Sequence, residues 1–270
     1  MTEAAARDAA APGYFERVDE GVYKPTAHAG GAWRTDEQHF SPLGGLILHA
    51  VDRHLAAQDG PRLLVSRVSF DILGQIALDE TRIVVETLRP GRTIELLEAT
   101  AYIGGRAVVR ARVWLLAPQD TAEVAGGGPE PLPAPESLPR WDLSERWSGG
   151  YIASIDVRPV GEPQPGRTTA WISSPLSVVQ GEVSGPVAEF VALVDTANGI
   201  AVRRSPQEWM FPNVDLTVHF HRQPVAGWTG LDTTVVFGPT GQGVTSTVLH
   251  DVHGPVGYAE QQLTVRPQQR

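Results

Sequence analysis

Hydrophobic positions in the first half of the chain first follow a helical period. Apolar residues recur at intervals of three and four, which predicts a helix that begins at Ser41-Pro42 and ends near Gly60-Pro61. The apolar face of this helix consists of Leu43, Leu46, Ile47, Ala50 and Val51. Two glycines, Gly44 and Gly45, stand inside it, although an interior glycine is less favourable than alanine by roughly 0.5–1 kcal/mol. They indicate a close approach, by a packed element or by a ligand.

After this helix the period changes to two, which predicts strands. In the first of them Leu64, Val68, Phe70 and Ile72 share a face, and further strands follow over 81–88, 93–103 and 106–116. Gly104-Gly105 joins the last two, and a glycine pair suits the positive φ angles of a two-residue hairpin turn. Ahead of the helix, residues 14–26 predict a short hairpin that turns at Glu20-Gly21.

The second half repeats this order after a segment rich in proline and glycine. Residues 117–140 have the composition of a linker, with almost no apolar periodicity. Residues 151–171 then resemble residues 14–33, and Gly185-Pro186 opens a second apolar helix that is predicted to run to about Gly199. Four strands follow, over 213–222, 229–237, 243–250 and 255–265.

One long helix followed by an antiparallel meander has an economical packing solution, in which the sheet curls around the helix and buries it. This is the hotdog arrangement. The sequence therefore predicts an α+β double hotdog, with two tandem antiparallel sheets each wrapped around a long helix. The expected domains are an N-terminal hotdog over 13–116, a linker over 117–145 and a C-terminal hotdog over 146–267.

Composition narrows the classes of partner. The 270 residues carry a net charge of −9, which argues against nucleic acid or an anionic membrane as a partner. No apolar run reaches the length of a membrane span, and residues 1–12 carry Glu3, Arg7 and Asp8, unlike a signal peptide. We therefore expect a cytoplasmic protein. The chain contains no cysteine, which excludes thiolate metal sites and cysteine nucleophiles.

Two polar residues stand where the pattern predicts burial. Asp195 interrupts the apolar second helix, and Gln261 lies on the inward face of the last strand. A buried carboxylate is unfavourable unless it is hydrogen-bonded, so Asp195 is either a functional group or a satisfied residue near the end of its helix. Gln261 has the same two interpretations. The amides at the start of the first helix could also face a carbonyl oxygen that gains negative charge.

Other chemistries lack their motifs. His219 and His221 have no third ligand at a suitable spacing, so we predict no metal site. The chain has neither the Gly-x-Ser-x-Gly motif of serine hydrolases nor the Gly-x-Gly-x-x-Gly motif of dinucleotide folds, and no cofactor is expected.

Several short motifs resemble the type II acyl-CoA thioesterases, a family of double-hotdog enzymes. They are Val85-Glu-Thr-Leu-Arg-Pro-Gly91, Glu98 to Arg106, the pair Gly44-Gly45, Asp215 with Phe220-His-Arg222, and Gln261 to Arg266. The resemblance covers most of residues 30–270. It implies hydrolysis of an acyl thioester, with an acyl-CoA or another acyl thioester as the substrate.

The resemblance also implies the site residues. The family's catalytic aspartate corresponds to Asp195 and its glutamine to Gln261, while the hydroxyl residue that completes the site corresponds to Asn213, which is a departure from the family pattern. The expected substrate-binding residues are Gly44 and Gly45, with Arg89, Arg92 or Arg222 at the coenzyme A phosphates. A homo-oligomer is expected.

Two alternatives remain open at this stage. Because Asn213 cannot share a proton as a hydroxyl does, the chain could be a catalytically weak acyl-binding protein with the same fold. The spacing of His49 and Asp52 on the first helix could instead serve a hotdog hydratase or dehydratase acting on an enoyl-CoA.

Overall fold

The computed structural model describes residues 12–60 and 62–268, and the prediction that residues 1–12 are no signal peptide lies almost entirely outside them. The N-terminal half begins with the predicted hairpin, β1 (Gly13–Asp19) and β2 (Val22–Pro25), and with a 3-10 turn, η2 (Ala27–Ala29). The helix α1 (Phe40–Ala56) and four strands follow: β3 (Leu64–Ile72), β4 (Thr81–Arg89), β5 (Ile94–Ile103) and β6 (Arg106–Leu116). The order of elements is the predicted one.

The C-terminal half repeats this order with more interruptions. Its elements are α2 (Gly150–Ser154), β7 (Asp156–Pro159), β8 (Arg167–Ser173), β9 (Ser177–Val179), α3 (Pro186–Val194), α4 (Ala197–Ile200), β10 (Trp209–Met210), β11 (Asp215–Phe220), β12 (Thr229–Phe237), β13 (Gln242–Asp251), β14 (Gly254–Thr264) and β15 (Arg266–Pro267). The second helix is therefore not continuous to Gly199. It ends at Val194, and a separate turn of helix follows.

Three local predictions can be compared with the structure. Gly104 and Gly105 have φ angles of 56° and 78°, as the predicted hairpin turn requires. The first helix ends at Ala56, four residues before Gly60. On β3 a bulge between Val65 and Arg67 shifts the register, so that Val65 is buried in place of the predicted Leu64.

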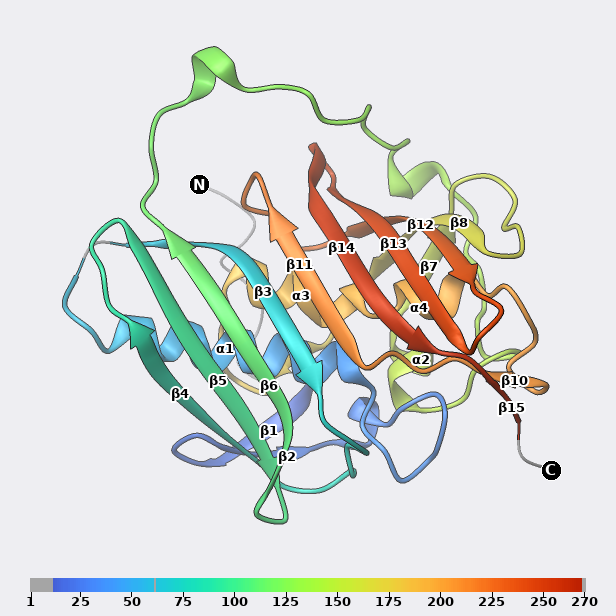
Figure 1. Cartoon of the computed structure of the whole chain (residues 1–270), viewed down its shortest axis with the longest axis horizontal. Helices are drawn as coiled ribbons and strands as arrows, with labels where there is room; N and C mark the ends of the chain where they lie inside the picture. Colours follow the sequence, from blue (N-terminus) through green and yellow to red (C-terminus); the bar gives the residue numbers. More distant parts are fainter. Residues whose placement is uncertain (1–11, 61, 269–270) are drawn as a thin grey trace.

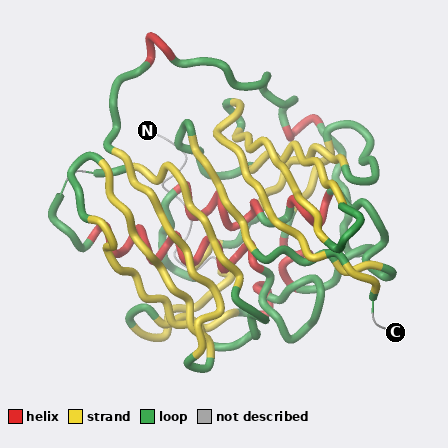
Figure 2. The backbone as a smooth tube through the Cα atoms, in the orientation of Figure 1, coloured by secondary structure: helices red, strands yellow, loops and turns green. Residues whose placement is uncertain are grey.

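The two predicted sheets are joined into one. Thirteen strands run in the order β7-β8-β12-β13-β14-β11-β3-β6-β5-β4-β2-β1-β9, and the two halves meet where β11 pairs antiparallel with β3. Figures 1 and 2 show these strands as a curved layer with the helices behind it. Pairing satisfies the backbone groups that β3 and β11 would otherwise expose at the edge of each meander. β9 of the second half also pairs with β1 of the first, in parallel.

The helices α1 and α3 pack on one another inside this sheet. Gly45 lies at their contact, where a methyl group in place of its hydrogen would come within 2.5 Å of Cβ of Ala192 and 2.9 Å of the Ala188 carbonyl oxygen. A Cβ on Gly44 would meet Phe40 and Val191 at 3.6 Å, an ordinary contact. The close helix–helix approach therefore requires Gly45, and the apolar faces of both helices form the core.

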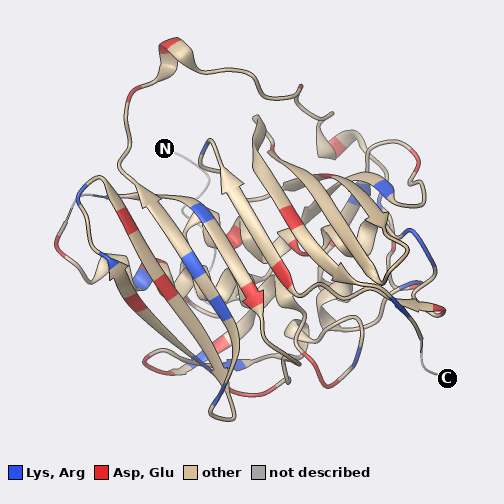
Figure 3. Cartoon of the chain, in the orientation of Figure 1, with Lys and Arg blue, Asp and Glu red and all other residues tan. Residues whose placement is uncertain are grey.

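The outer face of the N-terminal half of the sheet is charged. Figure 3 shows residues of both signs interspersed over β3 to β6. Glu98, for example, lies 3.5 Å from Arg110 and 3.3 Å from Arg112 across the strands. Exposed pairs of this kind contribute about 0–1 kcal/mol each, so they keep the face polar more than they stabilise it.

The segment that joins the halves contains two 3-10 turns, η3 (Ala122–Val124) and η4 (Pro135–Ser137), and otherwise follows the surface as an extended loop (Figure 1). The indole Nε1 of Trp171 donates a hydrogen bond to the carbonyl of Pro133 at 2.8 Å, which ties the segment to β8. In the part of the chain that the structure describes, no helix has the length and apolar character needed to cross a bilayer.

Candidate active site

Asp195 lies at the break between α3 and α4. It is the C-terminal cap of α3, with backbone angles of −66° and −8°, and α4 begins two residues later. The side chain is only 8% exposed. The sequence predicted a carboxylate inside a helix, but the chain opens at this residue, so the carboxylate leaves the helix axis and faces the N-terminus of α1.

Two amide side chains hold one oxygen of this carboxylate. Nδ2 of Asn213 donates to Oδ1 of Asp195 at 2.8 Å, and Nε2 of Gln261 donates to the same oxygen at 2.7 Å. Asn213 also donates to the carbonyl of Asp215, which fixes its orientation at the start of β11. The three residues predicted as catalytic are therefore in direct contact, although they are separated by up to 66 positions in the sequence.

Burial changes the acidity of Asp195. Removal from water raises the pKa of its carboxyl group from 3.8 to about 7, against the hydrogen bonds from Asn213 and Gln261, which lower it. A carboxylate with a pKa near neutrality can both accept and return a proton at physiological pH. This is the property expected of a general base that must later act as an acid.

His39 is a further residue of this site, to which the sequence pattern assigned no role. It is the N-terminal cap of α1, and its Nδ1 accepts the backbone N–H of Ser41 at 3.1 Å. The same Nδ1 lies 3.8 Å from Oδ2 of Asp195, and the imidazole stacks on the ring of Tyr151 with 4.2 Å between centroids. The only available sequence signal was its position directly before a predicted helix start.

A cavity of ≈ 370 Å³ opens beside these groups. Its polar lining includes His39, Asp195 and Asn213, while Gln261 lies behind the carboxylate and does not line it. Much of the remaining lining is apolar: Trp33, Phe40, Ile72, Ile76, Leu143, Trp147, Ile152, Met210, Pro212 and Val214. Trp33 packs edge-on against Trp147 and Phe211, with centroids 4.8 and 5.1 Å apart. An apolar cavity with a few convergent polar groups is typical of a small-molecule site.

None of the five predicted substrate-binding residues, among them Arg92, lines this cavity. Gly44 and Gly45 are buried at the α1–α3 contact, and Arg89 ends β4, where it donates to the carbonyl of Ile94. Arg222 follows β11, and its two terminal nitrogens each lie 2.7 Å from a carboxylate oxygen of Asp251.

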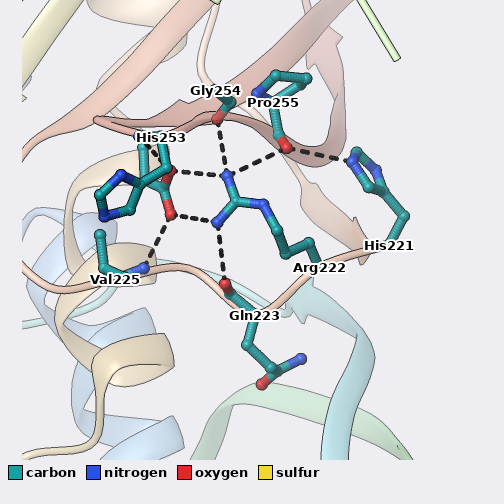
Figure 4. A network of polar contacts seen from close by, with 8 residues as sticks. His221, Arg222, Gln223, Val225, His253, Gly254 and Pro255 are labelled. Atoms are coloured by element: carbon teal, nitrogen blue, oxygen red, sulfur yellow. Dashed lines mark hydrogen bonds and ion pairs between the residues drawn. The ribbon is translucent and has the colours of Figure 1, made fainter. Parts of the chain in front are cut away.

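Figure 4 shows the guanidinium group of Arg222 among the carbonyl groups of Gln223, Gly254 and Pro255. Asp251 is buried, and the paired guanidinium lowers the pKa of its carboxyl group against the effect of burial. Through these contacts Arg222 links the start of the β11–β12 connection to the β13–β14 turn.

The residues behind the alternative functions also have partners. His49 contacts Ser184 through Nδ1 at 2.9 Å and Glu182 through Nε2 at 3.2 Å, so neither ring nitrogen is directed to Asp52. His219 and His221 lie exposed on β11 and just after it. Within residues 12–60 and 62–268, no three His, Asp or Glu side chains gather as a metal-binding group.

Comparisons with known proteins agree with this architecture. A family model described as the acyl-CoA thioesterase N-terminal domain matches residues 30–116, and one described as the C-terminal domain matches residues 128–265. A search of curated protein sequences found no match.

Solved structures share the fold at low identity. A candidate thioesterase from Novosphingobium aromaticivorans is 18% identical, with a TM-score of 0.73 over 93% of this chain and 98% of its own. A protein of unknown function with a hotdog fold, from Alicyclobacillus acidocaldarius, is 15% identical, with a TM-score of 0.71 over 100% of both chains. The acyl-CoA thioesterase II TesB2 from Mycobacterium marinum is 18% identical, with a TM-score of 0.66 over 94% of this chain and 95% of its own.

The structural matches show a hotdog fold, and the two family models together span most of the sequence. The chain therefore belongs to the type II acyl-CoA thioesterase family, and thioester hydrolysis is the activity that its domains support.

Proposed function

We propose that this protein hydrolyses an acyl-CoA to the free acid and coenzyme A, with Asp195 as the general base. The observation that carries the proposal is the Asp195 carboxylate: one oxygen is held by two amides, and the residue lines an apolar cavity. The raised pKa of Asp195 supports the same role.

In the proposed reaction, water attacks the carbonyl carbon of the thioester and gives up a proton to Oδ2 of Asp195. Asn213 and Gln261 keep Oδ1 in place, so that Oδ2 remains the base. The tetrahedral intermediate then collapses, the carbon–sulfur bond breaks, and the protonated Asp195 returns its proton to the departing thiolate. The products are a carboxylic acid and a thiol, and the enzyme ends as it began.

The departure at Asn213 is compatible with this mechanism. Asparagine lacks a hydroxyl group, but its amide donates to the base at 2.8 Å. A donor at that position orients the carboxylate without taking part in proton transfer. The apolar lining that includes Trp33, Phe40 and Trp147 would accept the acyl chain.

A panel of acyl-CoAs of different chain length, with release of free thiol as the readout, tests the proposal. We expect turnover of at least one substrate by the wild-type chain and its loss in Asp195→Asn, which keeps the size of the side chain. Arg222→Lys is no suitable control because it disrupts the pair with Asp251. His219→Gln is a suitable control, because His219 is exposed on the outer face of β11.

Other results would support other functions. Saturable binding of an acyl-CoA without release of thiol would favour the weak acyl-binding protein. Loss of the enoyl absorbance would favour a hydratase, although His49 pairs with Glu182 and Ser184 and not with Asp52.

We infer a double hotdog with units over 13–116 and 146–267 and a linker over 117–145, because each unit supplies a central helix, α1 or α3, and a meander. A homo-oligomer, a cytoplasmic location and a phosphate-binding role for Arg89 or Arg222 remain predictions from the sequence.

A further inference from the structure

The start of α1 provides fewer free amides than a helix normally does. The first four N–H groups of a helix have no partner within it, and such groups can stabilise a developing negative charge. In α1 the N–H of Ser41 donates to Nδ1 of His39, and residue 42 is a proline, which has no N–H. The N–H of His39 itself donates to the carbonyl of Ala29 at 2.8 Å. Three of the four expected donors are therefore missing at the end of the helix that faces Asp195.

The same contact determines the tautomer of His39. A neutral imidazole has one acceptor nitrogen and one N–H donor, and the partner of one nitrogen decides which is which. Because Nδ1 accepts the Ser41 N–H, Nε2 must carry the proton. Burial lowers the pKa of His39 to about 3, so the ring stays neutral at physiological pH.

The donor on Nε2 is available to a ligand. The imidazole lines the cavity that Asp195 also lines, and Nε2 makes no hydrogen bond with the described residues. The ring is held on both sides, by the cap on Ser41 and by the stacked ring of Tyr151, whose hydroxyl group pairs with Oγ1 of Thr196 at 2.6 Å. An N–H group with a fixed direction, close to the base, is a suitable hydrogen-bond donor to the reacting group.

We propose that the Nε2–H group of His39 donates to the carbonyl oxygen of the thioester and stabilises the oxyanion of the tetrahedral intermediate. The proposal rests on the proposed function. His39 replaces part of the donor set that the start of α1 lacks, while Asp195 handles the protons. No proton leaves His39 during the reaction, because a neutral imidazole donates a hydrogen bond without changing its charge.

Two substitutions separate the donor from the helix cap. His39→Asn keeps an oxygen that can accept the Ser41 N–H but has no donor at the position of Nε2. His39→Gln has an amide N–H that reaches the position of Nε2 but is a poorer cap. For each variant, kcat, KM and the melting temperature would be measured with the best acyl-CoA substrate, together with the pH profile of kcat/KM.

We expect His39→Asn to melt at the wild-type temperature, with kcat reduced about 100-fold and KM nearly unchanged, the size of effect seen when one oxyanion donor is removed. His39→Gln should melt at a lower temperature and retain more of kcat than His39→Asn. Both pH profiles should keep the wild-type midpoint, because His39 does not titrate in that range.

Three results would overturn the inference. The first is a kcat within about threefold of wild type in His39→Asn, since one oxyanion donor is worth far more than that. The second is a loss of rate that follows the melting temperature in both variants, which would indicate a structural role. The third is a displaced pH midpoint, which would make His39 an acid or base. If the wild-type chain released no thiol at all, the proposed function would fail together with the inference.

Discussion

Each end of the α1–α3 pair has an acidic residue beside the start of a helix, but side-chain amides contact the acid at one end and not at the other. At one end Asp195, after α3, faces His39 at the start of α1. At the other end Asp52, in α1, lies against Gly185 at the start of α3. Burial raises the pKa of both carboxyl groups, to about 7 for Asp195 and about 6 for Asp52. The helices are antiparallel, so each end combines one acid with one helix start.

The difference lies in the strands beside each acid. Each end has a cavity, of ≈ 370 Å³ next to Asp195 and ≈ 670 Å³ next to Asp52. The residues that lead into β11 line the first cavity and include Asn213, whereas the second is lined by Arg62 and Leu63 ahead of β3 and by Leu64 and Val65 at its start. Oδ2 of Asp52 is buried without a hydrogen-bond partner among the described residues. The two acids therefore differ in their partners: two side-chain amides donate to Asp195, and no side-chain amide of the described residues donates to the partly buried Asp52.

The largest expected effect separates the two acids. Asp195→Asn should lower kcat by at least about 1,000-fold, because the general base is lost, while Asp52→Asn should leave kcat within about twofold. Thiol release from the preferred acyl-CoA measures both, with melting temperatures to show that each variant is folded. Equal losses in the two variants would contradict the division of roles between the ends.

The second effect concerns the amide behind the base. Gln261→Leu removes a hydrogen bond to a charged group, worth about 1.5–3 kcal/mol, and should lower kcat by about 10- to 100-fold. Because this hydrogen bond lowers the pKa of Asp195, its loss should move the midpoint of the kcat/KM profile upward from about 7. A matched control is Gln262→Leu on the opposite face of β14, which should leave the midpoint unchanged. If the midpoint did not move in Gln261→Leu, Gln261 would have no effect on the pKa of Asp195.

The third effect tests the contact midway between the two ends. Gly45→Ala places a methyl group within 2.5 Å of Ala192 and should lower the free energy of unfolding by about 1–3 kcal/mol. Gly44→Ala meets its neighbours at 3.6 Å and should be neutral or stabilising by up to about 1 kcal/mol, as alanine favours the helix. Chemical denaturation measures the free energy of unfolding of both variants. Equal values would show that Gly45 is not the residue that the close approach of α1 and α3 requires.

The smallest effect is the pH dependence of stability at the Asp52 end. The folded chain binds the Asp52 proton more tightly than the unfolded chain, because the pKa is raised from 3.8 to about 6. This favourable contribution is complete below about pH 3.8 and is lost as the pH rises through 6. The free energy of unfolding of Asp52→Asn, relative to that of the wild type, should therefore rise by about 1–2 kcal/mol from pH 4 to pH 8. Chemical denaturation of both proteins at the two pH values measures this change. If the difference in free energy of unfolding between Asp52→Asn and the wild type were the same at both pH values, Asp52 would not be desolvated.

Local patterns in the sequence predicted most of the elements. The strand over 229–237 has the predicted limits, and the glycine turn at 104–105 has the predicted conformation. Both depend on residues close in the chain, because side-chain alternation and φ preference are local properties. The resemblance to the thioesterases pointed to Asp195, Asn213 and Gln261, but the contact between them lay beyond any local pattern.

What the tertiary structure alone decided are the long-range contacts. Pairing of β11 with β3 joins the two expected sheets into one. Arg222 forms an ion pair with Asp251. Packing of α3 against α1 brought His39 within 3.8 Å of Asp195, 156 positions later in the chain. The physical reason is that periodicity records which face of an element is buried, but the partner of a buried polar group depends on which elements meet there.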